Sequence, residues 1–190
     1  MEESDLCVVA RVRAGDGDGF RLLVERHSRS VFRLAYRMTG NEQDAEDVVQ
    51  ETFLRAFRQL HRYESRASFA TWLYRIAANY SLDLIRSRKR HFDHRQHANG
   101  EERDPLLSIP STDPGPDRTA FSSQIQERMT EALNELTPQE RTAFVLRHFE
   151  GQTIGEIRAV LGIGENAAKH SIFRAVQKLR KTLEPLVNVP

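Results

Sequence analysis

A short stretch in the first half of the chain combines residue types suited to binding nucleic acid. It reads FATWLYRIAANYSLDLIRSRKR, from Phe69 to Arg90, and joins aromatic side chains, an amide at Asn79 and several arginines. Aromatic rings can stack on bases that have left a duplex, at about 1–3 kcal/mol per base, and arginines can pair with phosphates. These residue types favour contact with a single strand.

Part of this stretch must also pack inside the protein. Its helical spacing assigns Phe69, Leu73, Ile76 and Tyr80 to a core. The outward groups are then Arg75, Asn79 and Arg86, together with the polar loop from Tyr63 to Ser68. Because unstacking costs a few kcal/mol per base step, such a surface must catch several bases together. The alternative is a solvated basic helix whose aromatic residues are all core.

The C-terminal part carries clear signals for a helix-turn-helix. TPQE at residues 137–140 predicts a capping box with proline in the first turn, and TIGE at residues 153–156 repeats the box. LGIG at residues 161–164 should end that helix before a basic helix from about Glu165 to Leu183. A short helix, a glycine turn and a longer basic helix is the outline of this DNA-binding motif.

The basic helix has two contrasting sides. The inward positions are predicted to be Ile172, Val176, Leu179 and Leu183, and the outward ones near its start are Lys169, His170, Phe173 and Arg174. Residues at the start of the second helix reach base edges in the major groove, where arginine and lysine donate to guanine or phosphate and phenylalanine contacts a thymine methyl. The alternative is an ordinary amphipathic helix pair with a solvated basic face.

Two further helices are expected upstream. Apolar residues recur at spacings of three and four in both of them: Phe20, Leu23, Val24, Val31, Leu34, Ala35 and Met38 in the first, then Ala45, Val48, Val49, Thr52, Phe53, Ala56, Phe57 and Leu60 in the second. A Gly-Asn turn with Asn41 as cap should make them antiparallel. Residues 42–51 hold five acids and no base. One acidic helix and two basic ones indicate partners of opposite charge.

The composition and the linker define the predicted architecture. The chain has 190 residues, 39% of them hydrophobic and 29% charged, and four of its seven prolines lie in residues 97–118. No segment shows the alternating pattern of a strand. We therefore predict an all-α protein of two small helical domains, residues 1–92 and 120–190, joined by a flexible linker at residues 93–119.

The same sequence argues against several other classes of protein. It contains none of the common enzyme motifs, so we expect no catalytic residue, no cofactor and no small-molecule substrate. His91, His94 and His97 lack further ligands and are interpreted as solvated linker residues, with no metal site. No apolar run approaches the length of a membrane span, and the acidic start is unlike a secretory signal. A cytoplasmic protein without membrane insertion is expected.

These motifs resemble a known family, the extracytoplasmic-function (ECF) sigma factors, which are bacterial initiation factors with only regions 2 and 4. DAEDVVQETFLRAF is similar to the polymerase-binding helix of region 2, and the stretch from Phe69 to Arg90 to the segment that follows it. LTPQERTAFVLRHFEGQTIGEIRAVLGI is similar to the start of region 4. The resemblance covers nearly the whole chain outside the linker.

The resemblance implies a set of partners and sites. Core RNA polymerase would bind through its β′ clamp helices and β flap, promoter DNA would be the second partner, and an anti-sigma factor the third. The β′ contact would use Asp47, Gln50, Glu51 and Leu54. The −10 element would be bound by Tyr63, Ser65, Arg66, Ser68, Arg75 and Asn79, with Arg86, Arg88, Lys89 and Arg90 on phosphates, and the −35 element by Lys169, His170, Phe173 and Arg174.

Two departures from the family pattern leave details open. Residues 166–171 read NAAKHS where the family usually reads GTVKSR, so the −35 sequence cannot be inferred. Arg158 replaces a small residue, and we expect its stem to lie along the surface with the charge in water.

Two rival functions remain at this point. One is a stand-alone helix-turn-helix repressor or activator, which would bind its operator without polymerase, and the other is a helical adaptor that binds only proteins. The acidic helix and the basic helix of the first domain argue against a repressor with a sensor domain, and the basic helix of the second argues against an adaptor.

Overall fold

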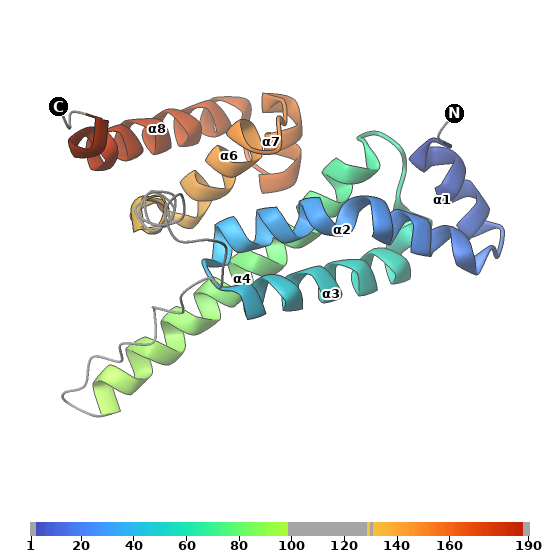
Figure 1. Ribbon diagram of the computed structural model, residues 1–190, viewed down its shortest axis with the longest axis horizontal. Helices are drawn as coiled ribbons and strands as arrows, with labels where there is room; N and C mark the ends of the chain where they lie inside the picture. Colours follow the sequence, from blue (N-terminus) through green and yellow to red (C-terminus); the bar gives the residue numbers. More distant parts are fainter. Residues whose placement is uncertain (1–2, 99–128, 130, 188–190) are drawn as a thin grey trace, which may run out of the picture.

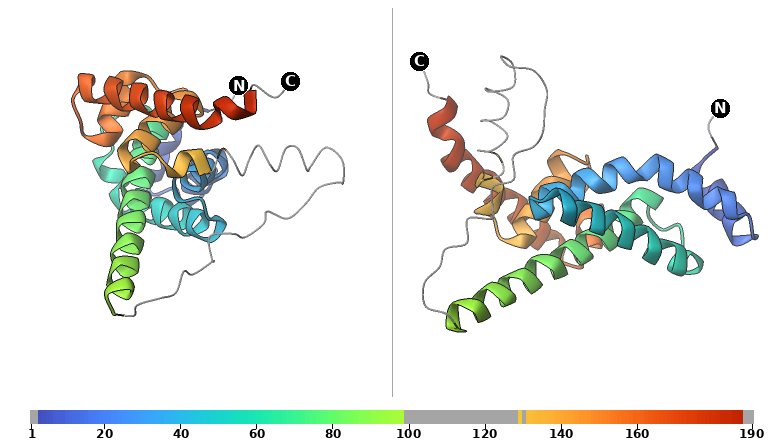
Figure 2. Two further views of the ribbon diagram at one scale, coloured as in Figure 1. Left: turned by 90° about the vertical axis from the view of Figure 1, so that its left-hand side faces the viewer. Right: turned by 60° about the horizontal axis from the view of Figure 1, so that its bottom comes forward.

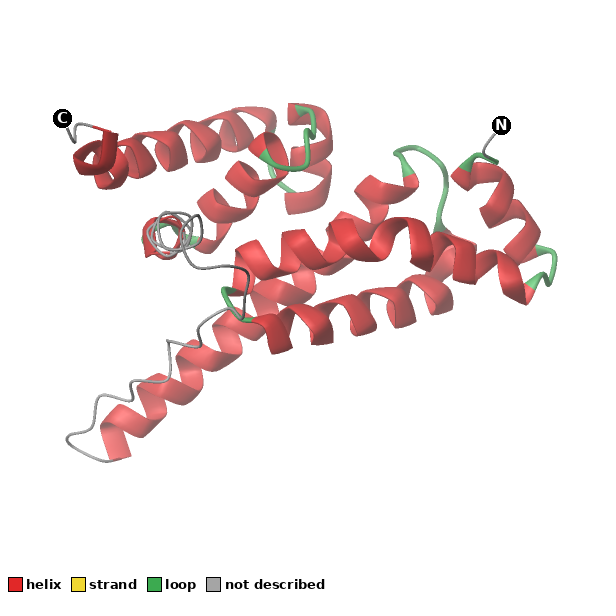
Figure 3. Cartoon of the chain, in the orientation of Figure 1, coloured by secondary structure: helices red, strands yellow, loops and turns green. Residues whose placement is uncertain are grey.

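The computed structural model describes residues 3–98, 129 and 131–187. Within these ranges the chain is helical and contains no strand (Figure 3). The elements are α1 (Asp5–Arg13), α2 (Gly17–Thr39), α3 (Glu42–Gln59), the 3-10 helix η1 (Leu60–Arg62), α4 (Phe69–Ala98), α6 (Pro138–His148), α7 (Ile154–Leu161) and α8 (Glu165–Val187). The predicted all-α fold with two helical domains is confirmed, and the expected linker from residue 99 onward lies outside the described residues.

Helices α2, α3 and α4 form the first unit, with α1 packed on α2 (Figure 1). The turn between α2 and α3 is the predicted one: Gly40 has a φ of 70°, and the Asn41 side chain accepts a hydrogen bond from the Asp44 amide at 2.9 Å. Left-handed backbone favours glycine, and asparagine is a good N-cap. The local sequence therefore sets where α2 ends and α3 begins.

The prediction of a buried side is wrong for one residue of α3, Phe57. Phe57 was placed on the buried face, yet it is 57% exposed. Its ring centre lies 4.9 Å from that of Phe20, in an edge-to-face arrangement. The buried positions Val48, Thr52 and Ala56 follow a spacing of four. Phe53, one turn earlier on the same side as Phe57, is only 7% exposed, so the cover over this side of α3 ends before Phe57.

Helices α6, α7 and α8 form the second unit. Both predicted capping boxes are present, at Thr137 with Glu140 and at Thr153 with Glu156. Gly162 ends α7 with a φ of 65°. Burial would raise the pKa of the Glu140 carboxyl, but the Lys178 ammonium at 2.7 Å and the cap bonds to Thr137 outweigh it and hold the pKa below its usual range.

The packing of α8 differs in part from the prediction. Leu179 is buried as expected, whereas Ile172, Val176 and Leu183 are only half-buried. The fully covered positions include the small residues Ala168, Ser171 and Ala175. Small side chains allow neighbouring helices to approach closely, and α8 packs against both α6 and α7.

The two units do not stand apart. Helix α6 contacts α2 and α7 contacts α4, and one buried apolar cluster runs through both units. Two views show α6 and α7 lying against α2 and α4 (Figures 1 and 2). Helix α4 continues to Ala98, past the expected boundary at residue 92, and its distal half projects beyond α2 and α3. In the described part no helix is long and apolar enough to span a bilayer.

The core accounts for stability, and one matched pair of leucines tests this. Leu34 of α2 is fully buried, while Leu54 of α3 is 44% exposed. We expect Leu34→Ala to lower the free energy of unfolding by about 2–5 kcal/mol, because it leaves a cavity in a close-packed interior. Leu54→Ala should change it by less than about 0.5 kcal/mol. Urea denaturation followed by circular dichroism measures both, and equal losses would contradict this assignment of the core.

Candidate nucleic-acid interface

Helix α4 presents a polar stripe to solvent. Exposed residues recur along it at spacings of four, four, three and four: Arg75, Asn79, Asp83, Arg86 and Arg90. This spacing keeps them on one side of an α-helix. The predicted outward positions Arg75, Asn79 and Arg86 thus lie together. Among the described residues, the side chains of Arg75 and Asn79 have no hydrogen-bond or ion-pair partner.

The basic end of the stripe is not uniform. Arg86 makes only an exposed contact with Asp83 at 3.6 Å, which is weak and easily exchanged for a phosphate. Arg88 instead pairs with the buried carboxylate of Asp44 at the start of α3. Burial raises the pKa of Asp44, and the Arg88 charge opposes that shift. Arg88, which was predicted to contact a phosphate, therefore also ties α4 to α3. The side chain of Lys89 lies outside the described residues.

The loop before α4 is shaped by Tyr63. The expectation that this residue faces outward is wrong: Tyr63 is 4% exposed, and its ring packs against Phe69 and Trp72. Its hydroxyl donates to the Ala67 carbonyl oxygen at 2.8 Å, and burial raises its pKa. A buried ring is unavailable for stacking on a base. Tyr63 closes the loop from inside and leaves its tip in solvent.

The tip itself is polar and constrained. Ser65, Arg66 and Ser68 are exposed as predicted, and Ser65 has a φ of 58°, a conformation that residues other than glycine seldom adopt. Arg66 pairs with Glu64 at 2.9 Å in solvent. The Ser68 hydroxyl accepts from the Thr71 amide at 3.1 Å and so caps α4. These contacts fix the loop beside the stripe of α4.

The aromatic residues of the stretch turn mainly inward. Phe69 and Tyr74 are buried, and Trp72 and Tyr80 are half-buried. The Arg55 guanidinium lies 4.8 Å from the centre of the Tyr80 ring. Stacking, which the composition first suggested, is therefore less available here than hydrogen bonding from Asn79, the arginines and the loop.

Helix α3 exposes a second stripe of different character. Asp47, Gln50 and Leu54 are exposed as predicted, and Phe57 extends the stripe by one turn. Glu51 is half-buried and accepts a hydrogen bond from Arg55 Nε at 2.6 Å. The surface changes from acidic to apolar along its length, which suits a protein partner more than DNA. The spacing of three from Leu54 was the signal that could have identified Phe57.

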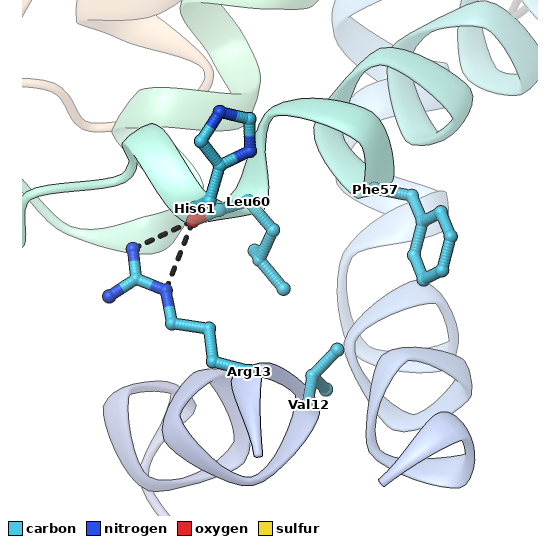
Figure 4. Close-up of a pocket in the computed structure, with 5 residues that line it drawn as sticks. All are labelled: Val12, Arg13, Phe57, Leu60 and His61. Atoms are coloured by element: carbon cyan, nitrogen blue, oxygen red, sulfur yellow. Dashed lines mark hydrogen bonds between the residues drawn. The ribbon is translucent and has the colours of Figure 1, made fainter. Parts of the chain in front are cut away.

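The apolar end of this stripe borders a hollow of about 410 Å³ between α1 and the end of α3. Figure 4 shows the side chains of Val12, Leu60 and Phe57 around it. The Arg13 guanidinium holds the wall by donating to the Leu60 carbonyl oxygen at 2.7 Å and to that of Tyr63. Helix α1 is thereby fastened to the base of the 63–68 loop.

Helix α8 carries the third exposed face. Lys169, His170, Phe173 and Arg174 are all exposed near its start, and Phe173 is 62% exposed. The ammonium of Lys169 meets Glu165 Oε1 at 2.6 Å in solvent, a contact of small worth. Arg158 on α7 is exposed, as predicted. An exposed phenylalanine among basic residues at the start of the second helix fits a groove-reading helix.

Comparison with known proteins relates these three faces to a family. A family model described as Sigma-70 region 2 matches residues 23–91, and one described as Sigma-70, region 4, matches residues 126–179. The ECF RNA polymerase sigma factor SigW of Bacillus subtilis is 31% identical over 179 residues, covering 94% of this chain and 96% of the relative. The chain belongs to the ECF sigma factors. Helices α2 to α4 form its region 2, and α6 to α8 its region 4.

Other relatives agree with this assignment. The ECF RNA polymerase sigma factor SigE of Mycolicibacterium smegmatis is 40% identical over 161 residues, which is 85% of this chain; the chain spans only 60% of that relative's length. A solved structure of CnrH in complex with the cytosolic domain of CnrY has a TM-score of 0.70 and 26% identity, covering 96% of this chain and 99% of that one. The resemblance inferred from the motifs is confirmed.

A second solved structure shares the fold. It is the sigma factor RpoE in complex with the anti-sigma factor NepR from Bartonella quintana, with a TM-score of 0.66 and 22% identity over 87% of this chain and 96% of that one. The two-unit helical architecture is therefore common to sigma factors of this kind.

Proposed function

We propose that this ECF sigma factor directs core RNA polymerase to its promoters through three separate surfaces. The acidic-to-apolar stripe of α3 binds the polymerase, the stripe of α4 with the 63–68 loop holds the opened −10 strand, and the exposed face of α8 reads the −35 duplex. The observation that supports this most directly is the unpartnered Asn79 and Arg75 on α4 beside a constrained polar loop.

The polymerase contact would come from Asp47, Gln50, Glu51 and Leu54, with Phe57 added. An exposed leucine and an exposed phenylalanine beside carboxylates form an apolar anchor with a charged rim, which is the usual anatomy of a specific protein interface. We assign this face to the β′ clamp helices and expect region 4 to meet the β flap.

At the −10 element the factor would act by capture. An amide such as that of Asn79 can both donate to and accept from a base edge, and the Watson–Crick edge is open to such pairing only when the base has left the duplex. Ser65, Arg66 and Ser68 would border that base, while Arg75, Arg86 and Arg90 neutralise phosphates. Each neutralised phosphate strengthens binding through counterion release, so the interaction should weaken steeply with salt.

Further assignments follow from this role. The factor makes no bond itself and needs no metal or cofactor, and it acts in the cytoplasm, where polymerase and promoters are. An anti-sigma factor is the expected regulator, as in the complex of RpoE with NepR. The alternative function, a stand-alone repressor, would leave the acidic-to-apolar face of α3 without a binding partner.

Run-off transcription tests the function directly. Adding the protein to core RNA polymerase and a genomic promoter library should produce discrete transcripts that core enzyme alone does not make. Leu54→Ala should raise the protein concentration needed about fivefold, since roughly 1 kcal/mol of apolar contact with the polymerase is lost. Tight promoter binding by the free protein with repression of transcription would instead favour the repressor.

Asn79→Ala tests the strand-capture site. The variant should fold and bind core enzyme normally, because Asn79 is exposed. Its open complexes should fall about tenfold, in line with a lost base contact of about 1–3 kcal/mol. Permanganate reactivity of thymines in the −10 region measures the melting. The matched control is Gln177→Ala, which changes an exposed amide in region 4 that has no partner among the described residues and should leave melting intact; unchanged melting with Asn79→Ala would remove this residue from the site.

Arg174→Ala tests the −35 surface. If Arg174 contacts a base edge, the variant should lose about 1–3 kcal/mol of affinity for its promoter and accept more sequences at one position of the −35 element. If it contacts a phosphate, affinity should fall evenly across sequences, with a salt slope lower by about one. Gel-shift assays with holoenzyme distinguish these outcomes. Arg180→Ala, on the same helix but well beyond its start, is the control.

A further inference from the structure

Helix α1 lies outside the residues that the region 2 family model covers. That model begins at residue 23, whereas α1 covers Asp5–Arg13. The helix is nonetheless closely packed, since Val8 is fully buried and Val9 is 3% exposed. It contacts α2 and η1, the 3-10 helix directly before the 63–68 loop. Helix α1 therefore joins the scaffold to the base of the proposed strand-binding loop.

The position of α1 on α2 is fixed at both of its ends. Asp5, in its first turn, accepts a hydrogen bond from Arg26 Nη1 of α2 at 3.0 Å. Near its other end, Val12 approaches Gly19 of α2 so closely that a Cβ on residue 19 would lie 2.8 Å from Val12 Cγ2. A larger residue at position 19 would have to displace α1. The last residue of the helix, Arg13, thus extends from a fixed support.

The guanidinium of Arg13 joins two carbonyl groups at the base of the loop. Its Nε and Nη2 atoms donate to the Leu60 carbonyl oxygen at 3.1 and 2.7 Å (Figure 4). Nη2 also donates to the Tyr63 carbonyl oxygen. Leu60 begins η1, and Tyr63 is its C-cap. Carbonyls at the end of a helix lack intrahelical partners and form its negative pole, so a planar cation with several donors suits both of them.

The start of the loop depends on this contact. In the part of the chain that the structure describes, no other group donates to the Tyr63 carbonyl oxygen. The Tyr63 hydroxyl in turn donates to the Ala67 carbonyl oxygen at 2.8 Å, near the end of the loop. Ser65, with its φ of 58°, lies between these two anchors. A residue in this conformation persists there only when its surroundings hold it, so both anchors are needed to keep the shape of the loop tip.

A direct contact between Arg13 and DNA would be a different role. Arg13 is exposed on its outer side, and its Nη1 atom makes no bond among the described residues. A cation in such a place could bind a phosphate. The geometry favours the anchoring role, because Nε and Nη2 already face carbonyl oxygens of the protein. The two roles differ in what lysine at this position would do and in the salt dependence of promoter binding.

We propose that Arg13 is a positioning residue for promoter melting, which holds the 63–68 loop in the shape that receives the −10 strand and does not itself contact DNA. Helix α1 is thereby part of the melting apparatus. This rests on the proposed function of that loop. Loss of the two carbonyl contacts lets the loop populate other conformations, so a smaller fraction of molecules is ready to take up the opened strand.

Fluorescence of Trp72 measures the loop in the free, full-length protein. Trp72 is the only tryptophan of the chain, and its ring centre lies 5.4 Å from that of Tyr63. Arg13→Gln should increase the quenching of Trp72 by acrylamide about twofold, because Tyr63 loses its carbonyl anchor and the local structure opens more often. Circular dichroism checks that the variant is folded.

Permanganate reactivity of the −10 thymines in holoenzyme measures the consequence for melting. Arg13→Gln should reduce open complexes about fivefold, as the loss of about one net hydrogen bond of loop order implies, while core binding stays unchanged. Arg13→Lys should recover less than about half of the lost melting, since an ammonium does not bridge two carbonyls as the guanidinium does. The salt slope of promoter binding should be the same in all three proteins.

The matched control is Arg11→Gln, which makes the same change of residue and charge on the same helix. Arg11 bonds to Glu3 and Asp16, away from the loop, so quenching and melting should match the unaltered protein. If Arg13→Gln fails to fold, Arg13→Lys decides the question, because it keeps the charge and should still increase quenching and reduce melting.

Two results would overturn the positioning role. One is unchanged quenching or unchanged melting in a folded Arg13→Gln protein. The other is full recovery of melting by Arg13→Lys together with a salt slope lower by about one in Arg13→Gln, which would identify a direct phosphate contact. Because the quenching measurement needs neither polymerase nor DNA, failure of the unaltered protein in run-off transcription would count only against the sigma function.

Discussion

Helix α4 must bury two of its sides at once, and the positions of both regions depend on this. It packs against α2 and α3 on one side and against α7 on another. Buried residues such as Leu73 and Tyr74 serve these contacts, and only one strip of the helix remains for solvent. With 3.6 residues per turn, that strip is a single row that includes Arg75 and Asn79. The candidate strand-binding surface is thus defined by what the core does not use.

The contact between the regions combines an apolar centre with charged groups. Leu146 and Ile157 lie in the same buried cluster as Leu34 and Leu73. Glu150 and Arg141 lie around them. Burial of the Arg141 guanidinium lowers its pKa to about 10, which still leaves it charged at neutral pH. When an interface opens, its charged groups regain hydration. A wholly apolar interface would instead expose apolar area to water, at a larger cost in free energy. Such a contact is specific when closed and compatible with separation.

The net charge of the chain is only +1, yet three of its helices expose surfaces of different charge. Helix α3 exposes carboxylates that run into Leu54 and Phe57, while α4 and α8 expose arginines and lysines. A surface of mixed acidic and apolar character suits a protein, and basic surfaces suit phosphates. A basic residue near the proposed DNA-binding face can also stabilise the fold. Arg88 does so by pairing with Asp44 of α3.

By itself the sequence determined most of the helices, several of their ends and most of their buried faces, since the cap at Asn41, the capping box at Thr137 and the apolar periods act within a few residues; it did not predict α1 or the continuation of α4 to Ala98. It also indicated Asn79 as outward. Only the tertiary structure decided that Phe57 is exposed, that Tyr63 is buried and that Glu150 joins the two regions. A helical period states which residues share a side, but whether that side is covered depends on neighbours far away in the chain, and residues 37 and 150 carry no local sign that they will meet.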